Sequence, residues 1–270
     1  MMPTQEHWKK WARNLKSQEK ELGKSKQKPF ANFVTQIDAK NSRVFVTRLE
    51  KIADLVSEKV VADIGCDHGF LIKILFEKGK ISSAFACDIS QKCLDKSSKN
   101  LSQYKDKVTF LCGDGLEVFT PYLDGNLGTK HQISLPEEVI ISGMGGKEII
   151  KILSSPEARH FSKFVLSPQK NLYEVRLFLS QNSFEFLSDE MIFENGIYYN
   201  LFKVQRTQCI KPMSEIELLY GTQNTQNPQG DFLDYCKKKI SDYEEILSKK
   251  EVNEIRKKYT YLKSILSRVE

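Results

Sequence analysis

The chain has 270 residues, of which 40% are hydrophobic, and this composition supports one or two folded domains with a substantial core. It contains no apolar run of about 18 residues and no leader-like segment. We therefore expect a cytoplasmic protein and not a membrane protein. The formal net charge of +6 is concentrated at the ends, where residues 1–30 hold eight Lys/Arg and three Glu, and residues 231–270 hold ten Lys/Arg and eight Asp/Glu. Basic ends suit a polyanionic partner, although solvated tails would give the same pattern.

The first part of the chain, residues 1–41, is charged and poor in aliphatic side chains. It is expected to form a basic extension with one short amphipathic helix around Trp8 and Trp11. The six cysteines show no C-x-x-C pair and no His-bracketed spacing, so no metal site is predicted and the thiols are expected to be reduced.

Short β-branched runs alternate with helical segments between residues 42 and 207. The runs that predict strands are residues 60–65, 83–89, 108–114, 138–143 and 163–169. Such alternation predicts a parallel sheet with helices on both faces. Two more extended runs, joined through Asn195-Gly196, predict an antiparallel hairpin. The expected fold is α/β and Rossmann-like, with a doubly wound, mostly parallel sheet of seven strands.

The rest of the chain has a different pattern. Residues 208–230 are rich in polar turn formers and predict a linker, and residues 124–138 predict a surface loop within the preceding domain. Residues 231–270 carry two apolar series at helical spacing, which are out of phase across 248–253. A single helix would not keep one apolar seam through that break, so two antiparallel helices in a coiled-coil-like hairpin are expected.

Acidic and glycine residues follow the first three predicted strands, in ADIGCDHG, CDIS and GDG. In an open parallel sheet the ligand binds beyond the carboxyl ends of the strands. Carboxylates there would repel the pyrophosphate of a dinucleotide, but they would attract the ammonium and sulfonium groups of S-adenosylmethionine. The third glycine of G-x-G-x-x-G is also missing. The sequence therefore predicts S-adenosylmethionine as the cofactor.

We assign the expected contacts of this cofactor to the strand ends. Asp88 is expected to accept hydrogen bonds from the ribose hydroxyls, and Asp114 from the adenine amino group. Each aspartate alone could be a helix cap or turn residue, but three at successive strand ends favour a binding site. The predicted cofactor-binding residues are Asp63, Gly65, Asp67, Asp88, Ile89, Asp114, Gly115 and Gly143.

The fourth strand ends in SGMGGKE, where glycines surround Met144. Glycine permits positive φ and leaves backbone groups uncovered, so a target base could lie beside the sulfonium here. A tight structural turn is the alternative for this segment.

Taken in order, ADIGCDHG, CDIS, GDGLEV, IISGMGG and the NG-x-YY hairpin resemble the bacterial tRNA adenine-22 N1-methyltransferase family over residues 42–206. The resemblance implies methyl transfer from S-adenosylmethionine to N1 of adenine 22 in tRNA, with the helical tail contributing to tRNA binding. The basic extension, the 124–138 loop and the polar stretch after Gly221 depart from the family pattern.

Methylation of a ring nitrogen that already has a lone pair depends mainly on positioning. Asp67 is expected to orient the donor, and Asp67 or His68 could receive the proton that the base later loses. His68 equally suits a structural role at the start of a helix. The predicted catalytic residues are Asp67, His68, Gly143 and Met144.

The predicted tRNA contacts lie in three places, and each has a plainer alternative. Arg48 could instead bind the donor's carboxylate or cap a helix, Tyr199 could be a core residue, and the cations of the tail could be solvated. The predicted tRNA-binding residues are Arg48, Tyr199, Lys237, Lys238, Lys239, Arg256, Lys257 and Lys258. The alternatives for the whole protein are methylation of another RNA or DNA position, and a non-catalytic RNA-binding protein. The oligomeric state is left open, with a monomer as the simplest case.

Overall fold

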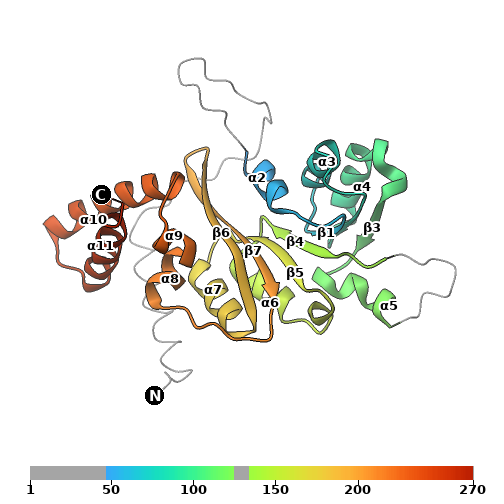
Figure 1. Cartoon of the computed structure of the whole chain (residues 1–270). Coiled ribbons are helices and arrows are strands. Elements are labelled where there is room, and N and C mark those ends of the chain that lie inside the picture. The colour runs from blue at the N-terminus through green and yellow to red at the C-terminus, as the bar shows by residue number, and fades with distance from the viewer. Residues whose placement is uncertain (1–46, 125–133, 270) are drawn as a thin grey trace, which may run out of the picture. The chain divides into compact units, whose positions relative to one another are not determined.

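The computed structural model describes residues 47–124 and 134–269 (Figure 1). The predictions for the basic extension and for the centre of the 124–138 loop lie outside the described residues. In chain order the elements are α2 (Arg48–Leu55), β1 (Val60–Ile64), α3 (Phe70–Glu77), β2 (Ser83–Asp88), α4 (Gln91–Asn100), η1 (Ser102–Lys107), β3 (Val108–Cys112), η2 (Gly115–Phe119), α5 (Thr120–Leu123), β4 (Glu138–Ser142), α6 (Gly146–Leu153), η3 (Glu157–His160), β5 (Lys163–Ser167), α7 (Leu172–Gln181), β6 (Phe184–Glu194), β7 (Ile197–Arg206), α8 (Glu215–Tyr220), α9 (Thr222–Gln226), α10 (Asp231–Lys249) and α11 (Asn253–Leu266).

The strands form one seven-stranded sheet in the order β3-β2-β1-β4-β5-β7-β6. Strands β1 to β5 pair in parallel, and β7 is antiparallel to both β5 and β6. The prediction of a doubly wound, mostly parallel sheet is confirmed. Strand order reverses on either side of β1, so the carboxyl ends of β1 and β4 flank the switch point at which open α/β sheets bind ligands.

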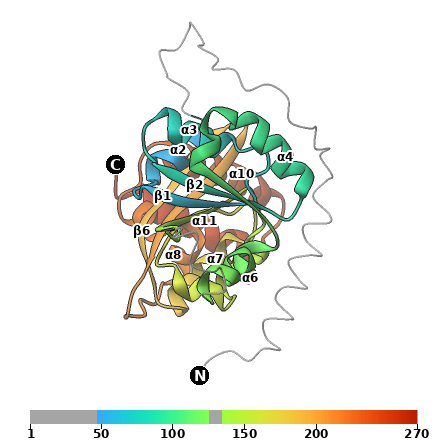
Figure 2. The same ribbon diagram turned by 90° about the vertical axis from the view of Figure 1, so that its right-hand side faces the viewer.

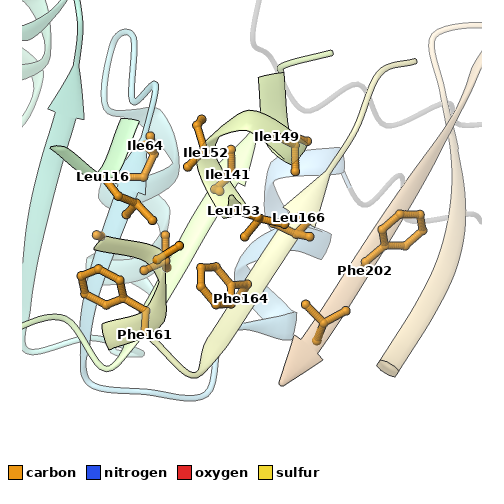
Figure 3. Close-up of a cluster of buried hydrophobic side chains, with 14 of the residues drawn as sticks. Ile64, Leu116, Ile141, Ile149, Ile152, Leu153, Phe161, Phe164, Leu166 and Phe202 are labelled. Atoms are coloured by element: carbon orange, nitrogen blue, oxygen red, sulfur yellow. The ribbon is translucent and has the colours of Figure 1, made fainter. Parts of the chain in front are cut away.

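Both faces of the sheet are covered because side chains alternate between them along each strand. Ala62 and Ile64 of β1 join a core cluster with residues of α6 and α7, whereas Val61 joins a second cluster with residues of α2, α3 and α4. Figure 2 shows these two groups of helices on opposite sides of the sheet. Figure 3 shows the first cluster, in which Ile141, Leu166 and other aliphatic side chains pack beside Phe164.

Strands β6 and β7 form the predicted hairpin, and the two-residue turn between them sets their register, in which Glu194 pairs with Ile197. Asn195 and Gly196 have φ values of 50° and 84°, as a type I′ turn requires. Positive φ costs glycine nothing and asparagine little, so this dipeptide matches the twist of the strands.

The C-terminal residues form the predicted helical hairpin. Phe232, Cys236 and Ile240 of α10 are buried in one cluster with Leu262 and Ile265 of α11. The two apolar series of residues 231–270 therefore lie on two separate helices, which pack against each other.

Residues 208–230, predicted as a polar linker, contain the helices α8 and α9. Ser214 begins α8 with a capping box to Glu217, and Tyr220 at the end of α8 is buried in the cluster of α10 and α11. This stretch is thus part of the packing between the sheet and the helical hairpin. No helix in the described part of the chain is long and apolar enough to cross a membrane.

Candidate active site

The loop after β1 turns sharply at the carboxyl edge of the sheet. The N–H groups of Gly65 and Cys66 both donate to the carbonyl oxygen of Cys87, at 2.8 and 3.0 Å. Gly65 and Asp67 have φ values of 77° and 47°. The positive φ favours glycine at position 65, and a Cβ there would also meet the terminal methyl group of Met144, so the loops after β1 and β4 approach closely.

Asp88 joins the loops that follow β1 and β2. Its Oδ2 accepts a hydrogen bond from the N–H of Asp67 at 3.1 Å, and its Oδ1 accepts one from the N–H of Ser90 at 2.8 Å. A carboxylate has about four lone-pair positions, so Asp88 can still accept hydrogen bonds from hydroxyl groups of a ligand. The predicted role of Asp88 is therefore compatible with its backbone contacts.

Asp63 lies inside the sheet edge, and its residue is only 3% exposed. Burial, together with the nearby charge of Asp88, raises the pKa of Asp63 to about 7. A carboxylate in such a place is costly to ionise unless a positive group lies beside it. The site therefore favours a positively charged ligand group beside Asp63.

The loop after β1 also carries a carboxylate–imidazole pair. Nδ1 of His68 lies 2.7 Å from Oδ2 of Asp67, and the His68 ring stacks on Phe70. The carbonyl oxygen of His68 accepts a hydrogen bond from Nδ2 of Asn100 in α4 at 3.0 Å. Burial raises the pKa of the neighbouring Cys66 thiol, which argues against a nucleophilic role for it. The pair can accept or relay a proton at the surface of the site.

Asp114 is engaged by a residue that sequence reasoning did not select. Its Oδ2 lies 2.6 Å from Nζ of Lys151 in α6, whereas Oδ1 has no hydrogen-bond partner among the described residues. A hollow of about 330 Å³ adjoins it, lined by Leu111, Cys112, Gly113, Asp114, Glu117, Val118 and Pro121. Ile89, at the neighbouring strand end, is 72% exposed. Apolar side chains beside the carboxyl groups of Asp114 and Glu117 suit a flat polar ring such as a purine.

The loops after β4 and β5 lie against each other. Gly143 has φ 79°, and the carbonyl oxygen of Met144 accepts a hydrogen bond from the N–H of Gln169 at 2.9 Å. The amide nitrogen of the Gln169 side chain lies 4.0 Å from the position that a Cβ on Gly143 would take. An exposed amide above bare backbone can donate and accept hydrogen bonds to a base.

Arg48 and Tyr199 are brought together at the same edge. The Arg48 guanidinium lies 4.9 Å above the Tyr199 ring, and its Nη1 is buried without a hydrogen-bond partner. The residues that follow α2 lie at the amino edge of the sheet, since the N–H of Ser57 donates to Glu138 at the start of β4. The start of α2, which carries Arg48, therefore lies toward the carboxyl edge. A buried, unpaired guanidinium nitrogen suits an anionic ligand group.

Most of the predicted cations of the tail are paired with acids. Four of them form ion pairs with nearby acids: Lys239–Asp242, Arg256–Glu251, Lys257–Glu215 and Lys258–Glu254. Lys237 and Lys238 are exposed and make no ion pair within the residues that the structure covers. The hairpin surface is therefore largely charge-compensated.

Sequence reasoning missed Lys151, Gln169 and Asn100. Gln169 could have been found by applying the strand-end rule to the fifth strand, which runs into Ser-Pro-Gln. Lys151 and Asn100 lie within helices, 37 and 32 positions from their partners, so no local signal marks them.

The sheet order and this edge define an α/β methyltransferase. A family model described as a methyltransferase domain matches residues 45–202, and the chain belongs to that family. A Mycoplasma pneumoniae relative named "Putative tRNA methyltransferase" is 31% identical over 179 residues, which cover 64% of this chain and 78% of the relative. A Mycoplasma genitalium relative with the same description is 31% identical over 164 residues, covering 59% and 69%.

Solved structures share the fold across most of the chain. The TrmK protein of M. capricolum, in complex with S-adenosylhomocysteine, superposes with a TM-score of 0.67 at 23% identity and covers 84% of this chain and 100% of its own. The B. subtilis m1A22 tRNA methyltransferase TrmK superposes with a TM-score of 0.64 at 19% identity, covering 82% and 98%. The resemblance predicted from the sequence motifs is confirmed.

Proposed function

We propose that this chain transfers the methyl group of S-adenosylmethionine to N1 of adenine 22 in tRNA. The observation that carries the proposal is Asp63, a buried carboxylate at the switch point of the sheet, with Asp88 close enough to affect its ionisation. A site of this kind favours a cationic ligand over an anionic dinucleotide. The names of the Mycoplasma relatives support tRNA as substrate, and the likeness to the B. subtilis m1A22 methyltransferase supports adenine 22.

The residues present fit the donor. Asp63 offers negative charge to its sulfonium and ammonium groups, Asp88 offers lone pairs to its ribose, and the hollow at Asp114 has room for its adenine. The buried Nη1 of Arg48 would take an anionic group, which is either the donor's carboxylate or a tRNA phosphate.

The reaction is an in-line displacement for which the chain supplies mainly orientation. When bound, the donor would supply an electrophilic methyl group, with adenine N1 forming the new bond, sulfur leaving with the electron pair, and the positive charge passing to the adenine. Bare backbone at Gly143 and the amide of Gln169 orient the base. The Asp67–His68 pair then receives the proton that leaves the exocyclic amino group.

The test is transfer to tRNA followed by mapping of the product. Purified protein, labelled donor and a tRNA transcript with adenine at position 22 should yield 1-methyladenosine at that position, identified by nuclease digestion and mass spectrometry. A matched transcript with guanine at position 22 should remain unmodified. Methylation of another nucleotide would contradict the assigned position, and donor binding with no transfer to any tRNA would contradict the assigned substrate.

A further inference from the structure

Helix α4 exposes a row of lysines on its outer face. Leu94 and Ser97 are buried against the domain, whereas Lys92, Lys96 and Lys99 are exposed. Their spacing of four and three residues places the three side chains on one helical face. No acid pairs with them in the described part of the chain, and Asp95 on the same helix accepts a hydrogen bond from Gln91 instead. We call Lys92, Lys96 and Lys99 the α4 lysine face.

Both ends of α4 are attached to the candidate active site. At its start, the N–H of the capping residue Ser90 donates to Asp88. At its end, Asn100 donates to the carbonyl oxygen of His68. A Cβ on Gly69 would also collide with the Ser97 hydroxyl, so α3 and α4 pack closely here. Helix α4, which carries the lysine face, therefore contacts the loop that holds the Asp67–His68 pair, and Figure 2 shows α4 beside α3.

The α4 lysine face differs from the helical hairpin in its charge balance. Within the described residues, four of the six cations predicted as tRNA contacts on α10 and α11 are paired with acids, and such paired charges offer little net attraction to phosphate. The three lysines on α4 make no ion pair within the described residues. The first and the last are separated by about 10 Å along the helix, which is enough to follow one nucleic acid strand over about three phosphates.

We propose that the α4 lysine face binds the tRNA backbone beside the target nucleotide and so presents adenine to the site. This proposal rests on tRNA being the substrate, and it names a docking surface on the catalytic domain itself. Phosphate contacts of this kind fix the register of the nucleic acid without reading its sequence.

The test compares two charge-matched triple variants of the whole chain. K92Q/K96Q/K99Q removes the α4 lysine face. The control K107Q/R159Q/K211Q removes three cations near the amino ends of β3, β5 and β6, at the opposite edge of the sheet. Binding to unmodified tRNA is measured by fluorescence anisotropy between about 50 and 200 mM salt, and the folded state of each variant by its thermal unfolding midpoint.

We expect the α4 variant to raise the Kd for tRNA by about tenfold or more and to reduce the slope of log Kd against log salt by about 2 to 3. The KM for tRNA should rise in parallel, while the Kd for S-adenosylmethionine and kcat at saturating tRNA stay unchanged. The control should bind within about twofold of the wild type. If the triple α4 variant fails to fold, the single variants Lys92→Gln and Lys99→Gln should each show a smaller loss and a slope reduced by about 1.

Unchanged tRNA affinity in the α4 variants would overturn the proposal, as would an equal loss in the control, which would show a general effect of net charge. The binding comparison does not depend on turnover. If the wild type binds tRNA but leaves adenine 22 unmethylated, the proposed reaction is wrong. The slopes of log Kd against log salt would still show whether the α4 lysine face binds tRNA.

Discussion

At the scale of the residue, Asp63 is the side chain that we propose to meet the positive charge of the donor. Its side chain is buried at the end of β1, and burial together with Asp88 raises its pKa to about 7. A positive group beside it would stabilise the ionised form and lower that pKa again. Donor binding and proton release from Asp63 should therefore be coupled near neutral pH.

This coupling predicts a pH dependence that Asp63→Asn removes. Between the unfolded pKa of 3.8 and the folded value of about 7, the folded protein holds more protons than the unfolded chain, so the stability of the free protein falls as pH rises through this window and levels off above it. Affinity for the donor should change in the opposite sense and rise with pH up to about 7. The Asn variant should bind more weakly, with little dependence on pH.

Thermal unfolding and donor titration between about pH 5.5 and 8.5 check both trends. Asp106→Asn is the matched control, because this aspartate is exposed before β3 at the other edge of the sheet. Identical pH profiles for the wild type and Asp63→Asn would contradict the role given to Asp63.

At the scale of elements, a buried guanidinium connects the sheet to the C-terminal helices. Arg176 of α7 is fully buried and donates to both carboxylate oxygens of Asp189 at 2.8 and 2.9 Å and to Asn200 at 2.9 Å. Its Nη1 also donates to the carbonyl oxygens of Leu218 and Leu219 in α8. The Arg176 guanidinium thus donates hydrogen bonds to polar groups of β6, β7 and α8.

Removing one partner of this pair should be costly. Arg176→Met leaves Asp189 buried without its cation, and the free energy of unfolding should fall by about 3–5 kcal/mol, measured by chemical denaturation. Lys211→Gln, which breaks an exposed ion pair with Glu185 on the same strand as Asp189, should leave the unfolding midpoint nearly unchanged. A loss of the same small size for Arg176→Met would show that Arg176 does not connect these elements.

Much of the fold could be predicted because its signals are local. The β-branched runs, the Asn195-Gly196 turn and the phase break at 248–253 each follow from a short stretch of sequence. Helix α8 also has a local signal, the capping box of Ser214 and Glu217, which the prediction of a linker overlooked. Helix α9 could not be predicted, because Thr222–Gln226 is a poor helical sequence that is held by tertiary contacts, such as the hydrogen bond from the N–H of Asp189 to Gln223.

The candidate site follows the same rule. The aspartates and glycines at the strand ends were predictable, because parallel strands share one carboxyl edge. The Asp67–His68 pair and the partners of the hairpin cations were not, because they depend on side-chain direction and on packing between elements. Sequence charge alone could not show that four of the six tail cations are paired with acids, and their contacts with tRNA stay a prediction.

At the scale of the whole molecule, negative and positive groups are separated around one edge of the sheet. Buried or loop carboxylates line the inside of the site, and the lysines of α4, which make no ion pair within the described residues, lie on a helix that contacts its loop. This separation suits a reaction between a small cation and a large polyanion, because each partner meets complementary charge. The proposed function depends on the inner, acidic part binding the cationic donor.

The most direct test is calorimetric titration of the purified chain with S-adenosylmethionine, beside Asp88→Asn and the control Asp106→Asn. We predict saturable binding to the wild type and to Asp106→Asn with equal affinity. The Kd for Asp88→Asn should be at least about tenfold higher, since the substitution removes the negative charge and replaces one acceptor oxygen with a donor. Absence of saturable binding to the wild type at millimolar donor, or equal affinity in all three proteins, would contradict the account.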